Sequence, residues 1–176
     1  MNSFNAKSWI KANCDGGKTL KQETLNVVSN FTLMWSFFEA TLCNKDADIK
    51  ALESVSNKIG KRPPLPVEIQ TAVRFWSERY VRGGEFNNLF ETLCFRRNDR
   101  REDVEAVLRC DKNDPESQLL AVMIIIYRLR NNLFHGLKQI SELNDQVPNL
   151  TVACRTLAAV MEVSDSPLFI AKAADD

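Results

Sequence analysis

The most apolar stretch of the chain, residues 119–129, constrains the fold more than any other feature. Its start is marked by Asp114-Pro115-Glu116, which offers a capping side chain, a proline for the first helical position and an acid for the first turn. We therefore predict a helix that begins there and ends near Gly136. A helix that is apolar on nearly all sides has to be covered by other elements. The stretch is too short to cross a bilayer, which takes about 20 apolar residues.

Apolar residues recur at helical spacing in most of the remaining sequence. Thr19 and Gln22 have the spacing of a capping box, which places the start of the first long helix at about residue 20. Gly60 ends the second helix, a proline-rich connector follows, and Gly83-Gly84 stops the third helix, which Pro66 can open. The expected helices before the apolar helix are residues 20–44, 46–59, 66–80, 86–95 and 99–109, the last of these capped by Asp99, and residues 146–162 form a helix after it.

No strand pattern, internal repeat or low-complexity segment is found. The predicted fold class is all-α, an up-and-down helical bundle of about six or seven helices. With 176 residues the chain is long enough to bury one sizeable core. We expect a single helical domain over residues 19–163, after a loose polar leader over residues 1–18 whose Trp9 and Ile10 can dock on the body, and before a peripheral tail over residues 164–176.

Composition excludes several classes of function. Lys and Arg number 23, as do Asp and Glu, so the formal net charge is zero and any contact with RNA has to come from a local patch. Five widely spaced cysteines and a single histidine provide neither a disulfide framework nor a zinc set. Residues 1–17 contain no apolar segment typical of a secretory signal. We expect a cytoplasmic protein with reduced thiols, without metal, cofactor or membrane contact.

The polar groups at the end of the apolar helix are the candidate functional residues. Tyr127, Asn131 and His135 are each four residues apart and share a face of an ideal helix. Arg130 lies about 140° from His135 around the helix axis, and its long side chain can bend toward the helix end. We predict that Arg130, Asn131 and His135 converge, with Asn131 placed to fix the tautomer of the imidazole, the one side chain that titrates near neutral pH.

A cation, an amide and an imidazole suit phosphate chemistry. Arginine presents a fork of donors that matches phosphate oxygens, and histidine can take or give a proton at pH 7. In RNA the 2′-hydroxyl is an internal nucleophile, so no metal is required to cleave the backbone. This mechanism uses both an acid and a base, whereas the chain has one histidine. A two-fold dimer that faces two such helix ends would supply both.

Residues 130–136 resemble the signature of the HEPN superfamily, which is an arginine, a polar residue next to it, and a histidine after four to six intervening residues. The aromatic run at residues 31–39 also resembles the opening helix of this family. The resemblance implies an all-helical bundle. It also implies a metal-independent ribonuclease that works as a homodimer with a shared site, of the kind found among bacterial toxins and anti-phage effectors. Arg130 would stabilise the phosphate, His135 would transfer protons and Asn131 would support them.

The same resemblance implies partners, namely RNA as substrate, a second copy of the chain, and a cognate antitoxin or regulatory protein. The family also contains members that do not cleave RNA. The alternative is therefore a non-catalytic HEPN-like helical module that binds a nucleotide, RNA or a protein partner. A third possibility is a helical adaptor in which the motif is only structural.

Each candidate residue also has a structural interpretation. His135 can complement the helix dipole, and Tyr127 is favoured as a core residue. Glu39 lies in the aromatic stripe of the first long helix; it is either solvated at the helix edge or buried against Arg128 or Arg130.

A basic turn at residues 96–101 leads into the helix predicted at residues 99–109. It is either a solvated face, since Asp99, Glu102 and Asp103 offset its charge, or the first place to look for contacts with the RNA backbone. The arginines of this turn are Arg96, Arg97, Arg100 and Arg101.

Overall fold

The computed structural model describes residues 4–62, 64–134 and 140–164, and within them the chain is an all-α helical bundle. The α-helices are α1 (Ala6–Asn13), α2 (Gln22–Leu42), α3 (Ile49–Gly60), α4 (Val67–Tyr80), α5 (Asn88–Glu91), α6 (Arg101–Leu108), α7 (Pro115–Phe134) and α8 (Val147–Glu162). Two 3-10 helices, η1 (Gly17–Thr19) and η2 (Ile140–Gln146), and two short strands, β1 (Val81–Arg82) and β2 (Glu85–Phe86), complete the described elements. The predicted fold class is confirmed.

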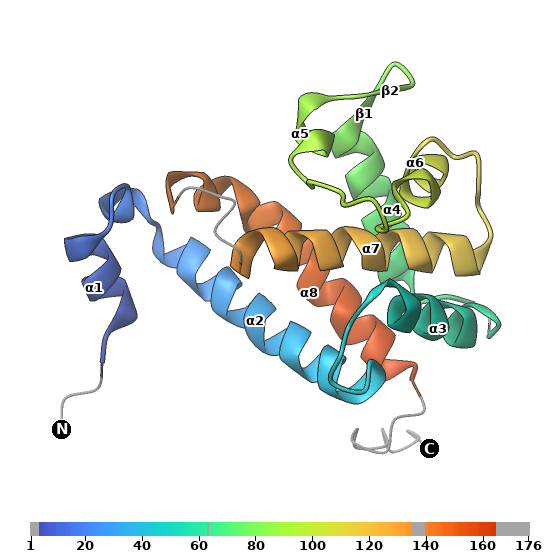
Figure 1. The fold of residues 1–176 in the computed structure, drawn as a ribbon, viewed down its shortest axis with the longest axis horizontal. Coiled ribbons are helices and arrows are strands. Elements are labelled where there is room, and N and C mark those ends of the chain that lie inside the picture. The colour runs from blue at the N-terminus through green and yellow to red at the C-terminus, as the bar shows by residue number, and fades with distance from the viewer. Residues whose placement is uncertain (1–3, 63, 135–139, 165–176) are drawn as a thin grey trace.

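Helix α7 runs through the middle of the bundle (Figure 1). Every side chain from Leu119 to Ile126 is buried. Helices α3, α4 and α6 pack against it, while α2 and α8 pack along each other and α8 also contacts α4 and α7. One continuous cluster of buried residues extends from Val27 in α2 to Met161 in α8. A helix that is apolar all round is therefore surrounded, as its sequence predicts.

The start of α7 follows its sequence signals. Asp114 Oδ1 accepts a hydrogen bond from the Ser117 backbone N–H at 2.9 Å, and Pro115 is the first helical residue. Gly60, the last residue of α3, lies against this start. A Cβ atom at Gly60 would lie 2.6 Å from Cγ of Glu116 and 2.8 Å from its Cα, so only glycine allows the end of α3 and the start of α7 to approach this closely.

Two predicted helix starts are wrong. Thr19 does not cap α2; it ends η1, and its hydroxyl donates to the Gly16 carbonyl at 2.7 Å, so that α2 begins at Gln22 after Lys21. Helix α4 begins at Val67, with Pro66 in the cap position rather than inside the first turn. Both differences shift a boundary by one or two residues and leave the helices in place.

The prediction that the chain contains no strand is also wrong. After α4, Val81 pairs with Phe86 and Arg82 with Glu85 in a two-stranded antiparallel hairpin. Gly83 and Gly84 form its turn, with φ of 58° and 84°. Two successive residues with positive φ are what a tight hairpin turn needs, and two glycines supply them without strain.

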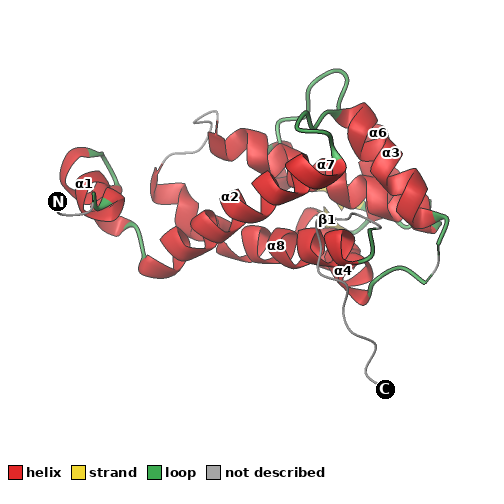
Figure 2. Cartoon of the chain, turned by 90° about the horizontal axis from the view of Figure 1, so that it is seen from below, coloured by secondary structure: helices red, strands yellow, loops and turns green. Residues whose placement is uncertain are grey.

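Helix α5 is shorter than predicted, because Cys94 adopts a left-handed conformation with φ of 52° and the chain leaves the helix at Glu91. The segment predicted as a loose leader contains α1. None of the residues of α1 is buried, Trp9 is 52% exposed, and the helix stands away from the bundle (Figure 2). The predicted tail lies outside the described residues except for Ser164. None of the helices described is both long and apolar enough to cross a membrane.

Candidate functional site

Three buried polar side chains follow the apolar part of α7. Arg128 is 1% exposed, Asn131 2% and Asn132 1%. A buried guanidinium or amide is costly unless its hydrogen bonds are satisfied, so the partners of these three groups decide what this end of the helix does. They fall into two sets that face different partners.

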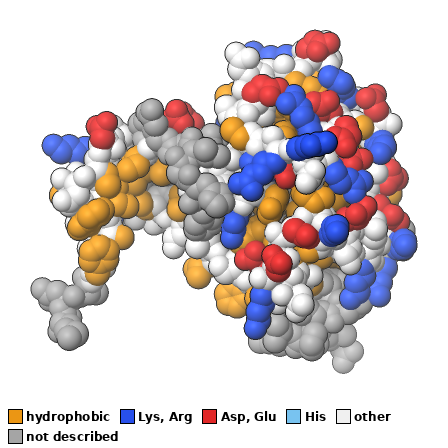
Figure 3. All heavy atoms as spheres, in the orientation of Figure 1, with side chains coloured by type: hydrophobic (Ala, Val, Ile, Leu, Met, Phe, Trp, Pro, Cys, Tyr) orange, Lys and Arg blue, Asp and Glu red, His pale blue; other side chains and the backbone are white. Residues whose placement is uncertain are grey.

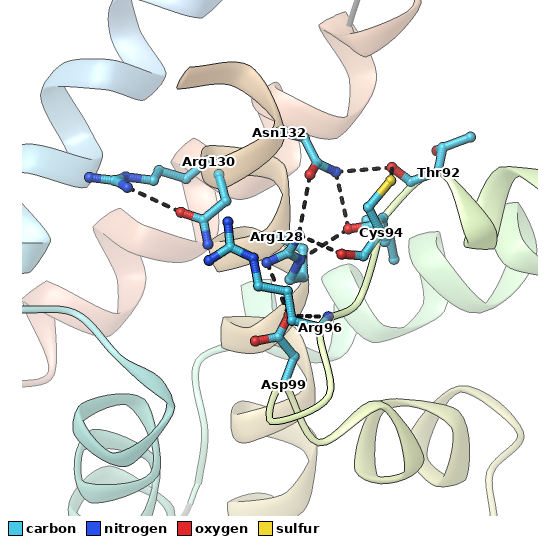
Figure 4. A network of polar contacts seen from close by, with 9 residues as sticks. Thr92, Cys94, Arg96, Asp99, Arg128, Arg130 and Asn132 are labelled. Carbon is cyan, nitrogen blue, oxygen red and sulfur yellow. Dashed lines mark hydrogen bonds and ion pairs between the residues drawn. The ribbon is translucent and has the colours of Figure 1, made fainter. Parts of the chain in front are cut away.

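Arg128 binds the loop that leads from α5 to α6 through hydrogen bonds and an ion pair (Figure 4). Its Nε donates to the Leu93 carbonyl at 3.0 Å, and one of its terminal nitrogens donates to the Cys94 carbonyl. The other terminal nitrogen lies 3.0 Å from Oδ2 of Asp99, which is 5% exposed. Burial lowers the pKa of Arg128, the Asp99 carboxylate opposes this, and the nearby positive charge of Arg96 lowers the pKa further.

Asn132, one turn later in α7, forms hydrogen bonds to the same loop. Its Nδ2 donates to the carbonyls of Thr92 at 2.9 Å and Leu93 at 3.1 Å, and its Oδ1 lies 3.4 Å from Arg128. We name Arg128, Asn132 and Asp99 the clamp. Residues four apart lie on one face of a helix, so Arg128 and Asn132 hold the loop against a single side of α7.

Asp99 has a different role from the predicted one. It was expected to cap the helix predicted at residues 99–109, but α6 begins at Arg101, and the cap position is occupied by Arg100 in a left-handed conformation. Asp99 Oδ2 instead accepts the backbone N–H of Arg96 at 2.6 Å and pairs with Arg128. A buried arginine needs a counter-charge, and Asp99 supplies it from the loop.

Arg130 and Asn131 form the second set. Arg130 donates to Oδ1 of Asn131 at 3.1 Å, and its guanidinium carbon lies 5.8 Å from the centre of the Trp35 ring. Trp35 is 2% exposed and packs in the core as predicted, so it also provides a rigid aromatic surface for the arginine. Nδ2 of Asn131 is buried, and it finds no acceptor among the residues that the structure describes.

Two of the supporting residues proposed from the sequence lie on the α2 side of this site. The Tyr127 ring is half-buried with its centre 6.2 Å from that of Trp35, which agrees with a packing role. Glu39 is half-buried and accepts a hydrogen bond from the Ala47 backbone N–H at 3.3 Å, where the chain turns from α2 to α3. The carboxylate that faces Arg128 is thus Asp99 and not Glu39.

The basic turn divides into two halves. Arg100 contacts Glu53 and Asp103, each at 2.6 Å, and Arg101 contacts Glu91 and Glu105, each at 2.6 Å. These two arginines are neutralised, and acidic and basic side chains alternate over this face of the molecule (Figure 3).

Arg96 and Arg97, in the other half, are exposed. The predicted patch of four is therefore a patch of two. The clamp that holds the backbone of Arg96 in place was not predicted from the sequence, because most of the acceptors in the clamp are backbone carbonyls.

His135 lies outside the described residues, which end at Phe134 before resuming at Ile140. Its predicted approach to Arg130 and Asn131 therefore stays a prediction. Within the described ranges no group of three or more His, Cys, Asp or Glu side chains could hold a metal ion.

Comparisons with known proteins add no assignment. No protein-family model, curated protein or solved structure matches the chain.

Proposed function

We propose that this protein is a metal-independent endoribonuclease of HEPN type. The observation that carries the proposal is the arrangement at the end of α7, where Arg130 is fixed between the Trp35 ring and the Asn131 amide. An arginine held in this way presents its donors in one orientation, which suits a phosphate group. In the sequence His135 directly follows the last residue of α7.

The proposed reaction divides between two side chains. His135 removes the proton of the 2′-hydroxyl, the oxygen attacks phosphorus, and Arg130 stabilises the charge on the phosphorane oxygens. The bond from phosphorus to the 5′-oxygen breaks, and this oxygen takes up a proton. The products are a 2′,3′-cyclic phosphate and a 5′-hydroxyl.

A second protonated imidazole has to supply the leaving-group proton, and the chain contains one histidine. A homodimer in which two copies of this helix end face each other provides both groups at one composite site. A ribonuclease of this kind would act as a toxin or anti-phage effector. It would need a cognate antitoxin, a regulatory protein or a trigger to protect its host.

The runner-up is a non-catalytic HEPN-like module that binds a nucleotide, RNA or a protein partner. It is supported by the same arginine and amide, because these donors bind a phosphate group whether or not a base is present. The two proposals differ only in proton transfer.

The test is RNA cleavage in EDTA by the wild-type protein, Arg130→Ala and His135→Ala, with the product ends identified. We expect wild-type cleavage to 2′,3′-cyclic phosphate ends and a loss of about 10²- to 10⁴-fold in each variant. Arg97→Gln, which changes an exposed arginine outside the helix, is the matched control and should cleave normally. Full cleavage by His135→Ala would exclude the mechanism, and sedimentation of an active monomer would exclude the composite site.

A further inference from the structure

A cavity of about 230 Å³ lies where the end of α4, the segment of α5 and the junction of η2 with α8 meet. Three polar side chains that line it are almost fully buried: Tyr80 is 1% exposed, Asn149 2% and Gln146 8%. Buried polar groups need hydrogen-bond partners, so the partners of these three decide what the cavity can bind. None of the lining residues belongs to α7, which separates the cavity from the proposed ribonuclease site.

Hydrogen bonds fix the orientation of the two buried amides. The indole N–H of Trp76, which can only donate, bonds to Oδ1 of Asn149 at 3.3 Å. The amide nitrogen of Asn149 therefore points the other way, and it donates to Oε1 of Gln146 at 3.1 Å. The amide nitrogen of Gln146, with its two N–H groups, is left without an acceptor among the residues that the structure describes.

Tyr80 and Arg79 add further donors to the same cavity. Burial raises the pKa of the Tyr80 phenol to about 12, although the charge of Arg79 and hydrogen bonds from Arg79 and Asn149 oppose this rise. The phenol therefore keeps its proton at neutral pH. Arg79 lines the cavity, and its Nε–H group is buried without an acceptor in the described part of the chain. A carboxylate, with two acceptor oxygens and a negative charge, matches such a set of donors.

Two carboxylates lie at the rim of the cavity. Glu142 and Asp145 line it from η2, and both are exposed. A 3-10 helix has three residues per turn, so these two side chains, three residues apart, lie on one side of η2. The charged side chains of the cavity are thus one cation, Arg79, and two anions. Ammonium groups are the complement of this rim, whereas the phosphate of a nucleotide would be repelled by it.

We propose that this cavity binds a basic α-amino acid. The carboxylate of the ligand lies against the buried donors of Arg79, Tyr80 and Gln146, and its two ammonium groups lie at Glu142 and Asp145. The two positive charges and one negative charge of such a ligand neutralise the charges of the cavity. The volume also suits a small metabolite, since pockets for drug-sized ligands start at about 300 Å³.

The test is isothermal titration calorimetry of the full chain with L-lysine. We expect saturable binding at one site per chain. Two matched ligands each lack one of the recognised groups, since cadaverine has no carboxylate and Nα-acetyl-L-lysine has no α-ammonium group. Each should bind at least about tenfold more weakly, because it leaves charged partners in the cavity without a hydrogen bond. L-Glutamate, which brings a second negative charge to the acidic rim, should not saturate the site.

Substitutions in the cavity locate the binding. Arg79→Gln should weaken L-lysine binding by about tenfold or more. The double variant Glu142→Gln, Asp145→Asn changes two exposed side chains, so it should fold normally and bind about tenfold more weakly. The matched control is Glu78→Gln, an exposed acid of α4 outside the cavity, which should change the affinity by less than about twofold. L-Lysine should raise the melting temperature of the wild type and of the control more than that of the double variant.

Several outcomes would overturn the proposal. Absence of saturable L-lysine binding would do so, and cadaverine binding as tightly as L-lysine would exclude a role for the donors. Equal weakening by Glu78→Gln and by the double variant would mean that only overall charge matters. If Arg79→Gln fails to fold, the double variant decides alone. The titration contains no RNA, so loss of L-lysine binding leaves the ribonuclease standing, and an RNA-inactive protein that binds L-lysine keeps this site.

Discussion

The clamp and the pair formed by Arg130 and Asn131 both lie at the end of α7, yet they differ in how their buried amides are matched. In the clamp, the Arg128 guanidinium meets two backbone carbonyls and a carboxylate, and the Asn132 amide meets two carbonyls. In the pair of Arg130 and Asn131, the Nδ2 group of Asn131 has no acceptor in the described residues. The hydrogen bonds of a matched amide hold neighbouring segments together, whereas an unmatched amide nitrogen adds no such link.

The largest effect on stability should come from Arg128. Arg128→Met leaves the Asp99 carboxylate buried without its counter-charge, together with two carbonyls that have lost a donor. We expect a loss of about 3–5 kcal/mol in the free energy of unfolding, measured by urea denaturation. Adding Asp99→Asn to this variant should recover part of the loss. Arg100→Met, whose ion pairs lie at the surface and are only partly buried, should cost less, about 1 kcal/mol. Equal losses in the two single variants would remove the distinction between clamp and surface.

The neighbouring asparagines should respond in opposite ways to one substitution. Asn132→Asp turns a carboxylate oxygen toward the carbonyls of Thr92 and Leu93, so it should destabilise the protein by about 1–3 kcal/mol. Asn131→Asp, in contrast, keeps an acceptor for Arg130 and loses no hydrogen bond that the described residues show, so it should not destabilise the protein. Thermal unfolding of the two variants side by side measures the difference. If both variants melted at the same temperature, the two amides would have equivalent surroundings and the comparison would fail.

A smaller effect should arise from thiols that belong to neither set. Burial, together with the negative charges of Glu39 and Asp48, raises the pKa of Cys43 to about 12, and burial raises that of Cys154 to about 11. The folded state therefore keeps protons that the unfolded state releases above its thiol pKa of 9.0.

The contribution of these two thiols to the free energy of unfolding should be fully present below about pH 8. It should fall as the pH rises past 9, by about 1 kcal/mol for each thiol at pH 10. Urea midpoints at pH 8 and pH 10 for the wild type and for the double variant Cys43→Ala, Cys154→Ala measure this. An equal fall in the double variant would assign the effect to other groups.

The sequence predicted those elements whose signals are local. The cap, proline and acid before α7, the apolar pattern of α2 and the last helix α8 each correspond to an observed element within a few residues. The hairpin was missed because Gly83-Gly84 was interpreted only as a helix stop, although two glycines in succession also favour a tight turn between strands.

The candidate site was predicted only in part. Arg130 beside Asn131 followed from the spacing of the motif, and their contact is observed. The role of Asp99 could not be predicted, because an aspartate shortly before a helix is an equally good cap and its partner Arg128 lies far along the chain. The main acceptors of the clamp are carbonyls, which every residue possesses, so no side-chain pattern marks them.

The clamp also determines when, during synthesis, the loop that carries Arg96 can be held against α7. Its hydrogen bonds join residues 34 and 40 positions apart, from Arg128 to Cys94 and from Asn132 to Thr92. During synthesis the N-terminal part of a chain emerges first. The loop that carries Arg96 is therefore made well before the helix that positions it. The clamp of a chain still on the ribosome therefore cannot assemble until α7 is complete, and until then the proposed ribonuclease would lack this ordered loop.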